Sequence, residues 1–165
     1  MGKMTSSQQD PFHSGEVYHL WSYLYDTKLH IVTMQVYINH TNELKLKNFL
    51  EDLLEDNYKE EEQQIEAILK EAGIRLPPGP PDRPNVNVED IPAGARINDD
   101  EITRFIQKKL MAEKLVCSYM ISMLNQEDII TLFEDFHSQK TEHEKKLVLL
   151  MKENGWFVQP PTNIK

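Results

Sequence analysis

The placement of the prolines constrains this chain more than any other feature of its sequence. Six of the nine prolines lie between residues 77 and 92, and the other three are Pro11, Pro160 and Pro161. No proline lies between Ser14 and Ala72 or between Asp99 and Asn154. Because proline breaks the interior of an α-helix, the sequence predicts two long helical halves joined by one stiff, non-helical connection.

Size and charge exclude several classes of protein. The 165 residues suffice for one domain with a hydrophobic core. A formal net charge of −9 argues against a nucleic-acid or anionic-membrane surface, since both need clustered Lys and Arg. No run of about 18 apolar residues occurs, so we expect no membrane span. The N-terminus does not resemble a secretory signal, and we expect a protein that stays inside the cell.

Apolar residues recur at steps of three, four or seven residues in four segments, which is the spacing of amphipathic helices. We expect these helices at residues 15–40, 43–72, 100–124 and 127–154. Ser14 is a suitable N-cap for the first helix, and Gly73 is a suitable C-cap for the second. The single cysteine, Cys117, lies on an apolar stripe and is expected to be a core residue. Residues 1–13 are predicted to be a flexible lead, and residues 14–161 a single domain.

The predicted crossover, residues 73–99, is long enough to return the chain to the end of the bundle from which the second helix began. Leu76 to Pro81 favour polyproline II, which rises about 3.1 Å per residue, whereas a helix of about 27 residues is roughly 40 Å long. The sequence therefore predicts an all-α, ferritin-like four-helix bundle with a long Pro-rich crossover between helices 2 and 3. The alternative, an up-down-up-down bundle, needs only a short link at this point.

In this topology, all four predicted helices lose their apolar pattern at about the same depth. The interruptions lie at residues 27–30, 57–61, 109–113 and 140–143. Ferritin-like di-iron proteins hold metal at this level with a Glu on each of two helices and a Glu-x-x-His pair on each of the other two. The match here is incomplete, because Gln64 follows Glu61 at the histidine position and Lys140 precedes His143 at the glutamate position.

Two interpretations of this polar layer stay open. In the first, no cofactor is bound, Glu113 pairs with Lys140 or Lys109, and His143 and Asn57 complete the hydrogen bonds. In the second, iron or manganese binds at a weakened site with four candidate ligands: His30, Glu61, Glu113 and His143. The sequence shows no phosphate-binding loop, zinc pattern or nucleophile–base set, so no catalytic residue and no enzyme activity are predicted.

Short motifs in three places carry a family resemblance: residues 76–81, 126–129 and 152–156, followed by Pro160-Pro161. With these motifs the chain, from about Ser14 to Pro161, resembles the spore coat F type proteins of Bacillus-like bacteria and a related group of uncharacterised ferritin-like proteins of bacilli. The resemblance implies a ferritin-like bundle, association with the endospore coat and no established enzyme activity. It implies no site residue.

We therefore expect a structural or interaction protein, made in the mother-cell cytoplasm and associated with the spore coat. Its expected partners are other coat proteins or further copies of itself, and Trp156 and Phe157 in the tail are candidate exposed contacts for self-association. A ferritin-like metal-binding protein is the alternative. A binding protein whose ligand enters between the helices is a third possibility.

Overall fold

The structure is a computed structural model and describes residues 10–164. The described chain is helical, without strands. In chain order its elements are α1 (Ser14–Asn39), α2 (Leu44–Asp52), the π-helical segment η1 (Leu53–Lys59), α3 (Glu60–Glu71), the 3₁₀ turns η2 (Val88–Asp90) and η3 (Ala93–Ala95), α4 (Asp99–Met123) and α5 (Glu127–Glu153). Residues 1–9 of the predicted flexible lead lie outside the described part.

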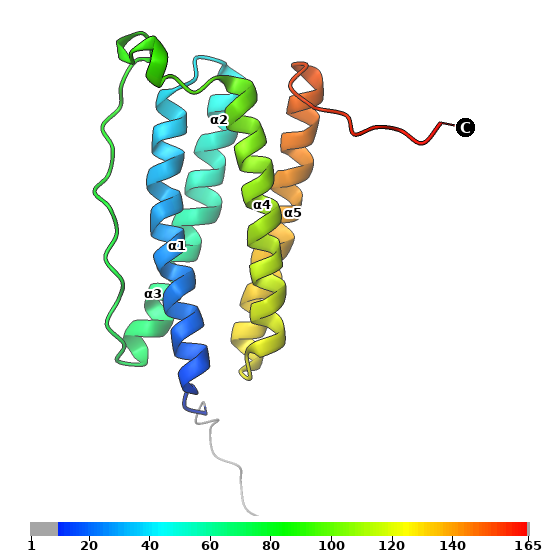
Figure 1. The fold of residues 1–165 in the computed structure, drawn as a ribbon. Coiled ribbons are helices and arrows are strands. Elements are labelled where there is room, and N and C mark those ends of the chain that lie inside the picture. Colours follow the sequence, from blue (N-terminus) through cyan, green and yellow to red (C-terminus); the bar gives the residue numbers. More distant parts are fainter. Residues whose placement is uncertain (1–9, 165) are drawn as a thin grey trace, which may run out of the picture.

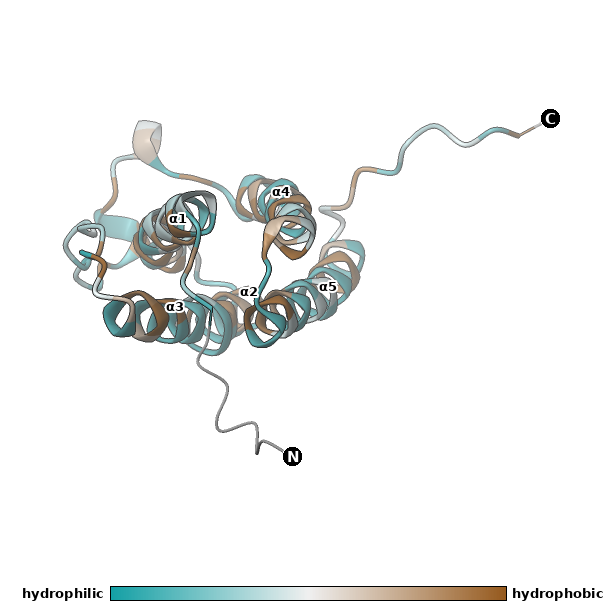
Figure 2. Cartoon of the chain, turned by 90° about the horizontal axis from the view of Figure 1, so that it is seen from below, coloured by the Kyte–Doolittle hydropathy of each residue, from teal (hydrophilic) through white to brown (hydrophobic). Residues whose placement is uncertain are grey.

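The helices form a four-helix bundle in which α2, η1 and α3 together make one long rod. Figure 1 shows α1 and this rod running in opposite directions, after which the crossover climbs back along the outside of the bundle. The rod and α4 therefore run in the same direction, and α5 returns beside α4. Seen end-on, the crossover lies outside α1 and α3 (Figure 2). The predicted bundle with one long crossover is confirmed, and the up-down-up-down alternative is wrong.

The helix ends follow local capping rules, with one correction. His13, and not Ser14, caps α1: its Nδ1 accepts from the Glu16 N–H, and its own N–H donates to Glu16 Oε1, both at 3.1 Å. Gly73 and Gly155 follow α3 and α5 with φ of +72°. There the Ile74 N–H donates to Leu69 O and the Trp156 N–H to Met151 O. These bonds satisfy carbonyls that the helix ends leave open.

Amide side chains on α1 hold the crossover against the bundle. Gln35 donates to Asp82 at 2.9 Å and accepts from the Arg83 N–H at 2.8 Å. One turn further, Asn39 donates to Pro84 O at 3.0 Å and accepts from the Val86 N–H at 3.1 Å. The extended segment cannot bond to itself as a helix does, so these side chains replace the missing partners of its backbone.

Two apolar clusters fill the bundle, one toward each end. One is built around Leu50, Leu110 and Leu147, and the other around Leu24, Leu69 and Phe133. Trp156 and Phe157 are partly buried against the first cluster, so they are not the exposed contacts that the sequence suggested. Between residues 10 and 164, no helix is long and apolar enough to cross a membrane.

Candidate functional site: a buried polar centre

The π-helical segment η1 brings polar residues of the second rod into the bundle interior. Five of the buried positions along this rod form a row at steps of four residues: Leu53, Asn57, Glu61, Ile65 and Leu69. A four-residue step overshoots the 3.6-residue turn of an α-helix, so a run of such steps drifts around the helix. The wider turns of a π-helix take up part of this drift. Asn57 and Glu61 thereby stay on the inward face.

Lys140 of α5 and Glu61 of α3 form the innermost ion pair. Lys140 Nζ lies 2.7 Å from Glu61 Oε1, and each side chain is only 1% exposed. The Tyr23 hydroxyl on α1 donates to the same Glu61 oxygen at 2.6 Å. Burying a charge is costly unless it is paired and hydrogen-bonded, and this contact set provides both conditions.

Glu113 of α4 is the second carboxylate of the polar centre and has three kinds of partner. The Tyr58 hydroxyl lies 2.9 Å from both Glu113 oxygens. His30 Nδ1 lies 2.9 Å from Oε1. Lys140 Nζ lies 3.7 Å from Oε2. The Lys140 ammonium therefore lies between two carboxylates supplied by different helices.

The charged groups of the polar centre shift one another's pKa values. Burial acts to lower the pKa of Lys140, but Glu61 and Glu113 raise it above the usual lysine value. Burial acts to raise the pKa of Glu113, but the hydrogen bond from His30 and the Lys140 charge lower it overall. For Glu61 burial outweighs Lys140 and the pKa is raised. The Lys140–Glu113 contact is thus ionised around neutral pH.

Burial shifts the pKa of four neighbouring groups toward their uncharged forms: Tyr23, Tyr58, Lys109 and Cys117. Burial, followed by the adjacent carboxylates, raises the pKa of Tyr23 and Tyr58 well above the usual value. Burial raises the pKa of Cys117 to about 11, so its thiol is a poor nucleophile at neutral pH, as expected of a core residue. Burial lowers the pKa of Lys109 to about 8. Its ammonium lies 5.5 Å from the centroid of the Tyr58 ring.

Little space is left among these side chains. The cavity that Tyr23, His30, Tyr58, Glu61 and Glu113 help to line has a volume of about 30 Å³. That volume has room for no more than a few water molecules. The polar centre is therefore too small for an organic substrate.

The structure brings together three of the four candidate metal ligands. His30, Glu61 and Glu113 belong to the polar centre, but His143 does not. The His143 ring lies against Phe49, and its Nδ1 is 2.9 Å from the Gln139 carbonyl oxygen one turn back on α5. Asn57 is fully buried as expected. Its side-chain amide has no hydrogen-bond partner among the described residues, so its predicted bonding role is wrong.

The sequence analysis missed the two tyrosines of the polar centre. Tyr23 lies one helical turn before Thr27, and Tyr58 lies three residues before Glu61. Both positions share a helix face with a predicted interruption of the apolar stripe. A tyrosine at such a position indicates a buried polar contact, because its ring fits an apolar core while its hydroxyl needs a polar partner.

The arrangement does not fit a resident metal ion. An ammonium cannot ligate a metal, and Lys140 lies where a cation would meet both carboxylates. Across residues 10–164, no group of three or more His, Cys, Asp or Glu side chains is arranged to hold a metal ion. The polar centre is an internally paired charge network in which Lys140 occupies the space between the two carboxylates.

These observations define a class: a four-helix bundle with one long crossover and a charge-paired mid-bundle layer. The chain belongs to the family described as "Protein of unknown function (DUF3231)", whose model matches residues 2–165. The expected membership in an uncharacterised family is thereby confirmed at that level.

Two relatives extend over almost the whole chain. "Uncharacterized protein YvdQ" of Bacillus subtilis (strain 168) is 34% identical over 166 residues, covering 100% of this chain and 97% of that protein. A crystal structure from Bacillus halodurans C-125, described as a "putative spore coat protein", matches with a TM-score of 0.92 and 36% identity. That match covers 96% of this chain and 99% of the other. The same bundle is therefore found in an experimental structure of a related protein.

Proposed function

We propose that this protein is a non-catalytic structural or interaction component of the spore coat. The observation that carries the proposal is the Lys140 ammonium between Glu61 and Glu113. The positive charge of Lys140 lies at the level of the bundle at which ferritin-like di-iron proteins hold metal. It pairs there with the carboxylates that would otherwise be free to bind a metal ion. A polar centre that is closed in this way favours a stable building block over an enzyme.

The coat assignment rests on similarity. The Bacillus halodurans protein that shares this fold is described as a "putative spore coat protein". The resemblance to spore coat F type proteins also supports an association with the spore coat. We infer that the chain is made in the mother-cell cytoplasm and then joins the coat. Its proposed partners are other coat proteins or further copies of itself.

An exposed apolar face offers a surface for these partners. Tyr18 on α1 and Leu115, Val116 and Tyr119 on α4 are between 45% and 67% exposed. They line a groove of about 440 Å³ between the two helices. Large exposed apolar patches on soluble proteins commonly mark interaction sites. This face replaces Trp156 and Phe157 as the proposed contact surface.

Localisation tests the proposal directly. The chain is fused to a fluorescent protein and expressed in sporulating Bacillus subtilis from which the gene for YvdQ is deleted. We expect the signal to move from the mother-cell cytoplasm to the spore periphery and to remain with coat extracts. A Leu115→Ser, Tyr119→Ser variant should fold but lose peripheral signal. A signal that stays diffuse for the unaltered chain would overturn the coat assignment.

Elemental analysis tests the metal-binding alternative. Protein produced with added iron and manganese should carry far less than one equivalent of metal. Stoichiometric metal that is lost in Glu113→Ala but kept in the exposed control Glu134→Ala would instead support a mid-bundle metal site. The two variants differ in burial, since Glu113 lies in the polar centre and Glu134 is exposed on α5.

A further inference from the structure

The solvent-facing side of α4 carries apolar side chains along most of the helix. Five of them are between 45% and 67% exposed: Phe105, Met111, Leu115, Val116 and Tyr119. Between Arg104 and Ser122 the helix has one acidic residue, Glu113, and its side chain lies in the polar centre. We call the exposed side chains of α4 from Arg104 to Ser122 the α4 strip. Apolar patches of this kind mark contact surfaces on soluble proteins.

The charge of the α4 strip favours a second copy of this chain as its occupant. Two molecules of net charge −9 repel each other, so contact between them is favoured where acidic side chains are absent. The strip meets this condition, since its exposed charged residues, Arg104 and Lys108, are both cations. A strongly basic partner would instead dock where acidic side chains are exposed, as Glu134 and Asp135 are on α5.

The centre of the α4 strip has the spacing with which two helices pack along their length. Its side chains follow one another at alternating steps of three and four residues: Phe105, Lys108, Ala112, Leu115, Tyr119 and Ser122. All six are exposed. Steps of three and four are the heptad spacing of paired helices. The buried face of α4, which includes Ile106 and Leu110, packs in the core of its own bundle. The helix therefore has a second face suited to another helix.

Antiparallel pairing of two copies of α4 makes the strip complementary to itself. We take the register in which Ala112 of one copy faces Leu115 of the other. The same register aligns two further contacts: Lys108 with Tyr119, and Phe105 with Ser122. Two of these contacts join a small side chain to a large one, which permits close packing, and the third places an ammonium on an aromatic ring. Parallel pairing would instead place Lys108 beside Lys108 of the other copy, and their charges would repel.

Two aromatic rings of the strip are held in place by α1. The Tyr119 hydroxyl lies 3.4 Å from His19 Nε2, and the centroids of these two rings are 5.1 Å apart, edge to face. The Phe105 ring stacks on Tyr37 with the ring centroids 6.5 Å apart. Because both rings already have fixed neighbours, less side-chain entropy is lost when they bind a partner.

We propose that two copies of this chain associate through the α4 strip as an antiparallel pair, with a two-fold axis between Ala112 and Leu115. This inference rests on the proposed function, because it names the partner that covers the exposed face of α1 and α4. A two-fold interface uses the same patch on both copies. The association therefore closes at two copies, and each contact of the register occurs twice.

Light scattering and sedimentation equilibrium on the full-length protein test the association. We expect a species of twice the mass of one chain. Lys108→Glu introduces an exposed acid into the strip and should raise the dissociation constant about tenfold or more. Lys146→Glu makes the same change at an exposed position of α5 and should have little effect. Thermal unfolding checks that both variants are folded. A monomer at every concentration, or equal dissociation constants for the two variants, would overturn the proposal.

Engineered cysteines test the register. Ala112→Cys and Leu115→Cys are made in separate chains, each with the buried Cys117→Ala change, and the two chains are mixed under mild oxidation. We expect the disulfide to join the two different chains, because these positions face each other in the antiparallel pair. Asp135→Cys and Ser138→Cys, three residues apart at exposed positions of α5, are the control pair and should cross-link far less.

The outcomes separate this inference from the coat assignment. Preferential cross-linking of the Ala112→Cys chain to itself, or equal cross-linking of the control pair, would overturn the antiparallel register. Both measurements use purified protein and do not depend on the spore. A diffuse signal in sporulating cells, together with an intact dimer, would overturn the coat assignment alone.

Discussion

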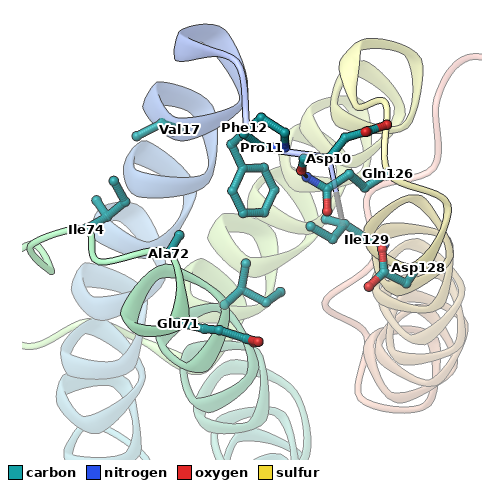
Figure 3. Close-up of a pocket in the computed structure, with 11 residues that line it drawn as sticks. Asp10, Pro11, Phe12, Val17, Glu71, Ala72, Ile74, Gln126, Asp128 and Ile129 are labelled. Carbon is teal, nitrogen blue, oxygen red and sulfur yellow. Dashed lines mark hydrogen bonds between the residues drawn. The ribbon is translucent and has the colours of Figure 1, made fainter. Parts of the chain in front are cut away.

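Acidic side chains line both the polar centre and the cavity beside the start of α5 (Figure 3), but only those of the polar centre, Glu61 and Glu113, are buried. Glu61 and Glu113 lie 2.7 and 3.7 Å from Lys140, and their cavity is about 30 Å³. The cavity beside the start of α5 has about 500 Å³ of space, and the three carboxylates in its wall, Asp10, Glu71 and Asp128, are exposed. The difference teaches that burial of charge alone does not identify a binding site. A binding site also needs room for a ligand.

The largest change in stability is expected when the positive charge of the polar centre is removed. Lys140→Met should lower the free energy of unfolding by about 3–5 kcal/mol, because it leaves two buried carboxylates without their ammonium. Urea denaturation at pH 7 measures the loss. The double variant Lys140→Met, Glu61→Leu should recover more than half of it, since an apolar pair replaces the ion pair. A loss below 1 kcal/mol would show that the contacts with Lys140 are not stabilising.

A hydroxyl group provides the next test. Tyr58→Phe removes the donor shared by both Glu113 oxygens and should cost about 1.5–3 kcal/mol, the range for hydrogen bonds to charged groups. Tyr18→Phe is the control. Because Tyr18 is 65% exposed, this substitution should leave the free energy of unfolding unchanged within error. Equal stabilities of the two variants in urea would contradict the assigned role of Tyr58.

The stability of the protein above pH 7 tests the burial of Lys109, whose pKa is lowered by burial more than Glu113 and Asp26 raise it. Its pKa is about 8 in the folded protein against 10.5 for an unperturbed lysine, through burial. The folded state therefore binds this proton more weakly, which disfavours folding below pH 8, and the penalty fades between pH 8 and 10.5. Lys109→Met should thus gain stability relative to the unaltered chain at pH 7, and this advantage should shrink by pH 10. An advantage that grows with pH would show the opposite sign of the shift.

The smallest expected effect is that of removing a charge at the end of α3, and the matched substitution in the polar centre should have a larger effect of the opposite sign. Glu71→Gln should raise the free energy of unfolding by about 0.3 kcal/mol at low salt, because Glu71 is the last residue of α3 and a negative charge is unfavourable at a helix C-terminus. Glu61→Gln in the polar centre should instead cause a loss of several kcal/mol, because Lys140 loses its nearest partner. Urea denaturation of both variants decides whether the signs differ.

The fold was accessible from the sequence because its determinants are local. Proline placement marked the crossover, apolar spacing marked the helices, and Gly73 and Gly155 marked two helix ends. The depth argument also placed Glu61, Glu113 and Lys140 in one layer. It failed for His143 because helix rotation decides whether a residue at the correct depth faces inward, and spacing alone does not fix that rotation.

The sequence by itself determined the helical rods, the long return between them and the level at which polar residues interrupt the apolar stripes, since these depend on backbone preferences and periodicity. Only the tertiary structure decided that Lys140 fills the polar centre and that Tyr23 and Tyr58 complete it. Those outcomes depend on which side chains from distant segments meet within a few ångströms, and hydrogen bonds and ion pairs are sensitive to that distance.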